Sequence, residues 1–516
     1  MTRIFFCLLL LLASCAAPEK PSSLRIAFQA SPATLDPRKA NDFISCSLMC
    51  LLYEGLMRNC PDGSVEPALA ERVEISHDLL VYTFYLRDAF WSDGKKVTAY
   101  ELEASWKKGI APEFPSLCAY LFYPIKHAEK ALRKEKPLED VGIRALDEKT
   151  FQVELERPCP YFLSLTAFSS FFPIPLDLQE NNLDQVRPLV VNGPFCLEMQ
   201  STHAKLLLKK NPRFWNRDSI RLEEISIHIV PDETTALHLF ERQELDWIGG
   251  ALSPISLDAL SLIKKKRQGQ FSPTAATTFC TFNTHKSPFD CKELRQALSL
   301  AINREEIIEH ITQMGEISAT RCLPPALMEG KNKHLYPSYD PKQAQALFSQ
   351  ACLTKKFPPA TLVFKSHPLD KQIAQLLQQQ WRKVLGIHIE LQEVDVKTHK
   401  KLLLSRNYDL SLSNWIAQVN DPINILERFK DLENSKNYPA WQDARFTNLV
   451  QAALETTQKE QRLQWIEAAE EVFAQAMPLA PIYHWTSFSL CQPRVKNLYT
   501  TPTGGVLFER SWISES

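Results

Sequence analysis

Residues 53–106 carry the densest set of folding signals in this chain: YEGL at 53–56, EPALAE at 66–71, YTFYLR at 82–87, WSDG at 91–94, TAYE at 98–101 and SW at 105–106. Within YTFYLR, the large side chains of Tyr82, Phe84 and Leu86 recur at every second position. A period of two is typical of a strand with one face on a core and one face toward water. The sequence therefore predicts a half-buried strand here.

Signals for a turn and a capped helix follow this strand. The Asp-Gly pair at 93–94 predicts a tight turn, because glycine accepts a positive φ angle at little cost. Thr98 and Glu101 have the three-residue spacing of a capping box at a helix start. Leu102 and Trp106 are four residues apart and share a face of that helix. The stretch is thus expected to form strand, turn and helix, and it contains no reactive constellation.

Composition limits the classes of function. The chain has 516 residues, with 59 basic against 60 acidic side chains and 45% hydrophobic residues. This length suggests two or three domains, and the apolar content is sufficient for real cores. The balanced charge implies no basic face, so nucleic acid is not an expected partner.

The N-terminus has the pattern of a targeting segment rather than of a folded domain. A positively charged residue precedes an unbroken apolar run at 4–12, which is shorter than the roughly 20 residues that a membrane-spanning helix needs. The run ends in LASC at 12–15, which resembles a bacterial lipobox. Residues 1–14 are therefore expected to be a lipoprotein signal peptide, and residues 15–23 a tether.

Acyl chains on Cys15 would hold the protein on the periplasmic or cell-surface face of a bacterial membrane. An ordinary signal peptide with an incidental cysteine is the alternative. Of the 13 cysteines, 11 remain once Cys7 and Cys15 are set aside. Because that number is odd, at least one thiol is expected to stay unpaired, and the spacing assigns no pairs.

Further elements are predicted along the chain. Strands are expected at 24–28, 141–155 (as a hairpin), 223–230, 279–283 and 387–391, and helices at 232–243, after the Asp-Pro pair at 340–341, at 373–385 up to Gly386, and over about 445–476. Asp290 with Glu293 has the spacing of a second helix cap. Strands alternating with helices indicate an α/β architecture.

The motifs of residues 53–106 closely resemble those of the large solute-binding proteins of ABC importers, the oligopeptide-binding type of family 5. Further matches to that family follow in order: LDP at 35–37, NGPF at 192–195, KNPRFW at 210–215, ELDW at 244–247, FNT at 282–284, PF at 288–289 and AINR at 301–304. The resemblance covers essentially the whole chain after the targeting segment.

The resemblance implies an α/β, two-lobed periplasmic-binding-protein fold of the large type II form, with an extra third domain and a two-segment hinge. Lobe I would comprise residues 24–43, 167–274 and 485–516, with the extra domain II at 44–166 and lobe III at 275–484. The ligand would lie in the cleft between the lobes, and hinge closure would trap it. The resemblance also implies a monomer without a cofactor, whose partners are an oligopeptide and the membrane subunits of an ABC permease.

NWIAQVNDP at 414–422 resembles the ligand-binding loop of this family. Trp415 is retained and can supply an apolar wall or a cation–π contact, with Asn414 and Ala417 beside it. In peptide-binding members an aspartate of this loop holds the α-ammonium group of the peptide, but the matching position here is the neutral Gln418. Because a buried cation needs a counter-charge, either the amine is held elsewhere or the ligand differs at that end.

Other residues at the site are expected by resemblance alone. Asn41, Asp42 and Phe43 match a segment that offers backbone and one side chain to an extended peptide, and Tyr120 matches an aromatic residue of the extra domain that flanks the ligand. For Phe43 and Tyr120, core packing is the alternative. Asp421 is the acid nearest to Gln418, and a helix-capping role is favoured over an ammonium-binding one.

Three classes of function follow from these patterns. The first is a lipid-anchored receptor that passes oligopeptides to an ABC importer, and the second is the same fold with another ligand: a cell-wall-derived or modified peptide, a sugar, a nickel chelate or haem. The third is an enzyme, an adhesin or a chaperone-like protein. The sequence has neither a G-x-S-x-G nor an H-E-x-x-H motif and only 14 glycines, which argues against an enzyme. His484 is interpreted as structural, with a place in the cleft as the alternative.

Overall fold

A computed structural model of the chain describes residues 22–201, 204–256, 258–260, 263, 269–328, 333–351, 357–456 and 458–514. The expected signal peptide at 1–14, the expected lipidation site Cys15 and most of the tether at 15–23 lie outside the described residues. Among the described residues, no helix combines the length and the apolar character needed to cross a membrane.

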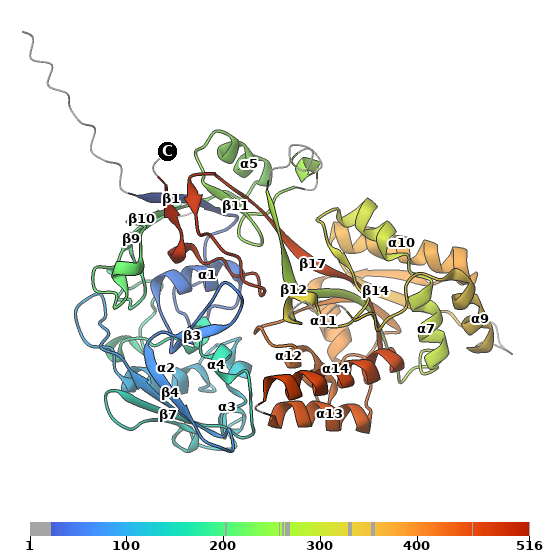
Figure 1. The fold of residues 1–516 in the computed structure, drawn as a ribbon, viewed down its shortest axis with the longest axis horizontal. Helices are drawn as coiled ribbons and strands as arrows, with labels where there is room; N and C mark the ends of the chain where they lie inside the picture. The colour runs from blue at the N-terminus through green and yellow to red at the C-terminus, as the bar shows by residue number, and fades with distance from the viewer. Residues whose placement is uncertain are drawn as a thin grey trace, which may run out of the picture.

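One large mixed sheet runs through the molecule (Figure 1), in the order β15-β14-β16-β12-β17-β11-β1-β10-β9-β8, with β13 paired to β17. Its strands are β1 (Ser23–Phe28), β8 (Phe195–Ser201), β9 (Lys205–Lys210), β10 (Glu224–Ile229), β11 (Trp247–Gly249), β12 (Gln270–Phe282), β13 (Ile317–Ser318), β14 (Thr361–Lys365), β15 (Glu390–Val394), β16 (Leu410–Ile416) and β17 (Leu479–Cys491). The pairing of β1 with β10 is parallel, as is that of β14 with β15, whereas the central pairs are antiparallel.

The antiparallel pair β12 and β17 connects the two lobes. Each strand is 13 residues long, and in Figure 1 they run from the part that carries β1 to the part that carries β14. Residues 489–491 of β17 pair with β11 in one lobe, and residues 276–282 of β12 pair with β16 in the other. Two chain crossings of this kind form the expected two-segment hinge, so the predicted two-lobed α/β fold is confirmed. The residue boundaries proposed for the domains stay predictions.

A second, antiparallel sheet lies in residues 70–154, in the order β4 (Ala70–Ile75), β5 (Val81–Leu86), β7 (Thr150–Glu154), β6 (Ile143–Ala145). Residues of β5 alternate between buried and half-buried, as the sequence predicts. Helix α2 (Ala99–Gly109) begins with the expected capping box of Thr98 and Glu101. It buries Trp106 against Phe151 and Phe171 in edge-on contacts with ring centroids 4.9 Å apart. The motif-rich stretch therefore builds the core of this part of the molecule.

The remaining elements cover the sheets. The helices are α1 (Phe43–Leu52), α3 (Ala128–Leu132), α4 (Phe162–Leu165), α5 (Glu233–Glu241), α7 (Lys292–Leu300), α8 (Arg304–Ile307), α9 (Pro341–Ala351), α10 (Pro368–Leu385), α11 (Val396–Leu404), α12 (Ile423–Leu426), α13 (Ala444–Glu455) and α14 (Lys459–Ala476). Two short hairpins are β2 (Met57–Asn59) with β3 (Val65–Pro67) and β18 (Val495–Lys496) with β19 (Trp512–Ile513). Gly386 ends α10 in the left-handed conformation, as predicted.

One local prediction is wrong, and another is confirmed with a break in its middle. Helix α7 has Cys291, not Asp290, at its N-cap, and no side chain of the described residues caps it. The Cys291 thiol donates to the Glu293 carboxylate at 3.3 Å. The helical region expected over about 445–476 is two helices. Thr456 is extended at the end of α13, with φ −94° and ψ 126°, and this conformation cannot continue a helix.

The ten described cysteines outside the targeting segment are all free thiols: Cys46, Cys50, Cys60, Cys118, Cys159, Cys196, Cys280, Cys291, Cys322 and Cys491. Cys118, Cys159, Cys280 and Cys322 are buried, so they pack as small apolar residues of the core.

Candidate ligand-binding site

A row of neighbouring side chains crosses the central strands where the lobes join. Thr277 of β12 pairs with Trp415 of β16 on one side and with His484 of β17 on the other. Ile317 of β13 pairs with His484 and extends the row. Because residues directly opposite each other project from the same face of a sheet, these side chains form one continuous surface. The loop after β16, which contains Gln418, leaves the sheet at one end of this row.

The ligand loop is fixed to the sheet by its backbone. The N–H of Ala417 donates to the carbonyl of Ala275 at 2.8 Å, and Ala417 is buried. The side-chain oxygen of Asn414 accepts a hydrogen bond from Lys365 Nζ at 3.0 Å. The half-buried ring of Trp415 lies against the guanidinium of Arg428, with Cζ 4.0 Å from the ring centroid. Trp415 and Gln418 are thus held on a rigid support.

Asp421 is occupied by other partners. Its carboxylate accepts from the N–H of Ile423 at the start of α12 at 2.9 Å and forms an ion pair with Arg462 at 2.8 Å. Asp421 thus contacts the first turn of α12, but it does not occupy the N-cap predicted from the sequence, because Pro422 stands at that position without a side-chain cap. A ligand ammonium group would have to compete with the Arg462 guanidinium for the same oxygen.

Tyr120 comes to the ligand loop from the other side of the cleft. It lies in a short 3₁₀ helix at Ala119–Phe122, and its hydroxyl accepts a hydrogen bond from the side-chain amide of Gln418. The ammonium group of Lys436 lies 4.1 Å from the centre of the Tyr120 ring and 5.4 Å from that of Trp415. Burial raises the pKa of the Tyr120 phenol to about 12. The structure therefore brings Trp415, Gln418 and Tyr120 together, as the resemblance implies.

Residues 41–43 make their described contacts away from Trp415 and Gln418. Asp42 caps α1 by accepting from the N–H of Ser45 at 2.9 Å. Asn41 is exposed, and Phe43 is 40% exposed and close to Gly504. Among the described contacts, none joins these three residues to Trp415 or Gln418. Their expected role as ligand contacts therefore stays a prediction.

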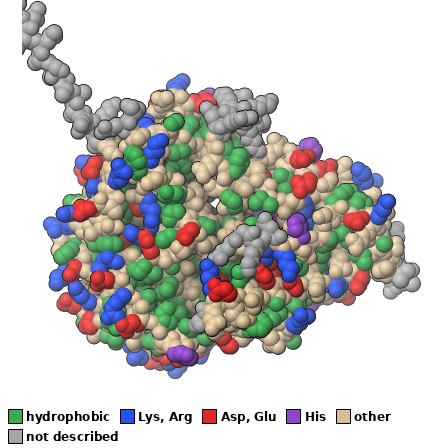
Figure 2. All heavy atoms as spheres, in the orientation of Figure 1, with side chains coloured by type: hydrophobic (Ala, Val, Ile, Leu, Met, Phe, Trp, Pro, Cys, Tyr) green, Lys and Arg blue, Asp and Glu red, His purple; other side chains and the backbone are tan. Residues whose placement is uncertain are grey.

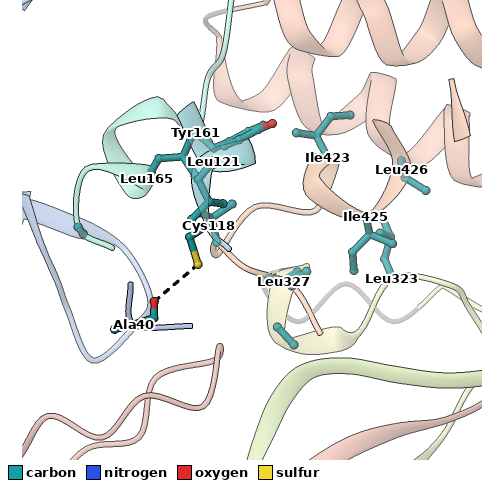
Figure 3. Close-up of a cluster of buried hydrophobic side chains, with 14 of the residues drawn as sticks. Ala40, Cys118, Leu121, Tyr161, Leu165, Leu323, Leu327, Ile423, Ile425 and Leu426 are labelled. Carbon is teal, nitrogen blue, oxygen red and sulfur yellow. Dashed lines mark hydrogen bonds between the residues drawn. The ribbon is translucent and has the colours of Figure 1, made fainter. Parts of the chain in front are cut away.

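Buried apolar side chains from both lobes form a cluster where the lobes meet (Figure 3). This interlobe cluster consists of Ala40, Cys118, Leu121, Tyr161, Leu165, Leu323, Leu327, Ile423, Ile425 and Leu426. In Figure 3 the Tyr161 side chain points across the gap toward Ile423. Its hydroxyl donates to the carboxylate of Glu427 at 2.5 Å, a contact between residues 266 positions apart in the chain. Burial raises the pKa of both groups.

His484 is buried at the base of this region, 2% exposed. Its Nδ1 lies 2.8 Å from the Thr277 hydroxyl, whereas its Nε2 has no hydrogen-bond partner among the described residues. A hollow of about 630 Å³ opens beside it, lined in part by Arg304, Thr320 and Arg321. Burial, assisted by the positive charge of Arg321, lowers the pKa of His484 to about 3. The imidazole is therefore neutral at physiological pH.

We expect this buried histidine to make folding sensitive to acid. The folded-state pKa lies below the unfolded value, so below pH ~6.5 the unfolded chain binds a proton that the folded chain does not. His484 should therefore lower the free energy of unfolding by about 1.4 kcal/mol for each pH unit below that value. Urea unfolding at pH 7 and pH 5 measures this loss. It should shrink in a His484→Gln variant, and an equal loss in both proteins would contradict the prediction.

Sequence reasoning misses Arg428 and Lys436, which surround the Trp415 ring. Arg428 is 3% exposed although it carries a charge, and it follows the apolar turn of α12. The only sequence signal is a charged residue close to an apolar INIL segment at 423–426. Such a signal is common on solvated helix faces and does not single out a buried site.

The surface view shows how charge is distributed over one face of the molecule. In Figure 2 basic and acidic side chains are interspersed over both lobes, as the balanced composition implies. Within the part of the chain that the structure describes, no group of three or more His, Cys, Asp or Glu side chains is placed to hold a metal ion.

Known proteins share both the fold and the length of this chain. Residues 64–437 match the family described as bacterial extracellular solute-binding proteins, family 5. The oligopeptide-binding protein OppA of Bacillus subtilis (strain 168) is 32% identical over 505 residues, covering 95% of this chain and 93% of that protein. The unliganded open form of MppA, a periplasmic murein tripeptide-binding protein, gives a TM-score of 0.84 at 25% identity, covering 96% and 98%. Peptide-bound OppA of Listeria monocytogenes gives a TM-score of 0.73 at 25% identity, covering 96% of this chain and 100% of that chain.

Two α/β lobes, joined by a pair of long strands and meeting at an aromatic site, define a solute-binding protein. The chain belongs to family 5 of the bacterial extracellular solute-binding proteins. Members of this family are transport receptors, so the protein is a binding protein and not an enzyme.

Proposed function

We propose that this protein is an extracytoplasmic lipoprotein, anchored through Cys15, that captures oligopeptides between its lobes and delivers them to an ABC importer. The carrying observation is that Gln418, in the loop after Trp415, meets Tyr120 of the facing domain. A ligand held there contacts both halves of the molecule, so its binding favours the closed arrangement. The relatives named as oligopeptide-binding and murein tripeptide-binding proteins support a peptide as the ligand.

The interlobe cluster supports closure around such a ligand. Its apolar side chains come from both lobes and are buried against one another, so bringing the lobes together removes apolar surface from water. Main-chain hydrogen bonds to an extended peptide give affinity with little dependence on sequence, and bridging waters let pockets accept varied side chains. Delivery to a transporter requires that the ligand leave unaltered.

Calorimetric titration of the mature protein with a small peptide library tests the proposal. The expected result is saturable binding of one peptide per chain, with the peptide recovered intact. Absence of binding by the whole library would contradict it, as would release of shortened products.

A second candidate ligand is a modified or cell-wall-derived peptide. The neutral Gln418 motivates it, because an ordinary α-ammonium group gains no counter-charge from that side chain. The likeness to a murein tripeptide-binding protein supports it. Native mass spectrometry of the purified protein distinguishes the candidates by the mass of a co-purified ligand, including a nickel chelate or haem.

Gln418→Asp is expected to favour peptides with a free amine. A carboxylate at this position faces Tyr120 and can accept hydrogen bonds from an ammonium group, which a neutral amide does only weakly. The affinity for a free-amine peptide should rise about tenfold relative to the same peptide N-acetylated, a gain typical of one charged hydrogen bond. Calorimetry with the peptide pair measures the ratio, and Gln418→Asn is the neutral control. An unchanged ratio would place the amine outside this pocket.

A further inference from the structure

The guanidinium of Arg428 is buried, and none of the described residues is its hydrogen-bond partner. The residue is 3% exposed, and Nε, Nη1 and Nη2 all lack a hydrogen-bond partner among the described residues. Aromatic rings surround it: Cζ lies 4.0 Å from the centre of Trp415, 4.5 Å from Phe429 and 5.7 Å from Phe279. Ring faces attract a cation but cannot accept the directed hydrogen bonds of its five N–H groups. A buried charge in this state is rare and calls for an explanation.

A second cation lies beside the first. Lys436 is half-buried, and its ammonium group approaches the rings of both Tyr120 and Trp415. Burial, then the charge of Arg428, lowers the pKa of Lys436, and burial lowers the pKa of Arg428 to about 10. Two like charges near one aromatic ring repel each other, so an anion placed between them would be bound strongly.

The neighbouring acids do not serve as that anion. No described carboxylate lies within ion-pair distance of Arg428 or Lys436. The charge of Glu427 partly offsets the lowering of the Lys436 pKa, but Glu427 accepts a hydrogen bond from Tyr161, and burial raises the pKa of the Glu427 carboxyl. Asp421 is paired with Arg462. The counter-charge must therefore come from outside these side chains.

Trp415 provides another free donor at the same place. Its Nε1 is buried and has no hydrogen-bond partner among the described residues. Gln418, three residues after Trp415, is neutral and contacts Tyr120. Guanidinium, ammonium and indole N–H groups are all donors, and a carboxylate is an acceptor that can satisfy several of them together.

We propose that Arg428 and Lys436 form an anion-binding subsite beside Trp415 and Tyr120, which takes a carboxylate group of the ligand. The inference rests on the proposed function and narrows it: the preferred peptide presents a carboxylate, from an acidic side chain or from its C-terminus, to the two cations beside the Trp415 ring. The charge stays buried and unpaired in the free protein, and ligand binding neutralises it.

Three peptides and one variant test this subsite by calorimetry. Ala-Glu-Ala carries a side-chain and a terminal carboxylate. Ala-Gln-Ala lacks the side-chain carboxylate, and Ala-Gln-Ala amide lacks both. At least one of these steps should weaken binding to the wild-type protein about tenfold to a hundredfold, as expected for a hydrogen bond to a charged group. The step that matters identifies the source of the carboxylate. In Arg428→Met the same step should change the affinity less than about twofold.

Melting temperatures separate a ligand-binding arginine from a structural one. Because Arg428→Met removes an uncompensated buried charge, the free variant should melt at or above the wild-type temperature. The matched control is Arg295→Met: Arg295 is equally buried, but its guanidinium donates to the carbonyls of Phe289, Ala476 and Met477. That control should melt lower and keep the carboxylate preference.

Several outcomes overturn the inference. A carboxylate preference that persists in Arg428→Met would do so, as would wild-type protein that binds all three peptides alike. A steep fall in the melting temperature of Arg428→Met would make the arginine structural. If the wild-type protein binds none of these peptides and none of the library, the proposed function fails as well.

Discussion

Replacing Trp415 with alanine is expected to lower the affinity for peptide by roughly thirtyfold or more, the loss typical of a buried aromatic anchor at a binding site. The Trp415 ring belongs to the row of side chains that crosses the central strands, where it lies opposite Thr277 of β12. It also approaches both cations of the proposed subsite. Its removal takes away an apolar wall and lets water reach Arg428, which weakens every charge interaction there.

The same substitution should change the melting temperature of the free protein little. The ring is only half-buried, so less packing is lost than in a full core truncation. Hydration of the Arg428 guanidinium, which has no hydrogen-bond partner in the described part of the chain, offsets part of that loss. Calorimetry and thermal unfolding measure the two effects separately.

Trp465→Ala is the matched control for this prediction. Trp465 is also a half-buried tryptophan packed against the core, but it lies on α14 and not in the row of side chains that crosses the central strands. It should leave the affinity near the wild-type value. Equal affinities of Trp415→Ala and the wild-type protein would remove Trp415 from the site.

Local sequence patterns are sufficient to predict much of the fold. The alternation at 82–86 gives β5, the spacing of Thr98 and Glu101 gives the start of α2, and Gly386 gives the end of α10. These signals act between residues within one turn or one strand, so they are visible in the sequence itself. The resemblance adds the order in which such units are joined.

Strand β12 shows one limit of local patterns. The sequence predicts a strand at 279–283, whereas β12 starts at Gln270. Pro273 lacks a backbone N–H and argues against a strand, and the structure accommodates it beside a register shift between Pro273 and Thr277. The crossing is therefore longer than its own residues predict, because its partner β17 imposes the pairing.

The site shows a second limit. Trp415 and Gln418 are found by resemblance, but the contact of Gln418 with Tyr120 joins residues 298 positions apart. The burial of Arg428 depends on rings from three segments of the chain, and no local periodicity encodes it. The cap predicted at Asp290 fails because the helix begins one residue later, with Cys291 at the N-cap.

The second large effect is expected at the ion pair of Arg321 and Glu470. Both side chains are almost fully buried, 2% and 0% exposed, and Arg321 Nε lies 3.2 Å from Glu470 Oε2. Glu470 also accepts from the N–H of Leu323 at 2.8 Å, so the pair ties the segment that carries Leu323 and Leu327 to α14. Arg321→Met should lower the free energy of unfolding by roughly 3–5 kcal/mol, because it leaves a buried carboxylate without its counter-charge.

The pH dependence of this loss distinguishes an unpaired charge from lost packing. Burial already raises the pKa of Glu470, and removing Arg321 should raise it further. A group whose folded-state pKa is raised stabilises the fold below its unfolded pKa and loses that contribution as the pH rises. Urea unfolding should therefore show a larger loss for Arg321→Met at pH 8 than at pH 5.

Two further variants isolate the charge. The double variant Arg321→Met, Glu470→Gln keeps an acceptor for the Leu323 N–H and removes the buried charge, so it should recover most of the stability at pH 8. Arg72→Met breaks an ion pair with Glu74 in which the side chains are 54% and 60% exposed, and it should cost far less, because solvent screens an exposed pair. A loss for Arg321→Met as small as that for Arg72→Met, or one independent of pH, would mean that water and the neighbouring chain already compensate Glu470.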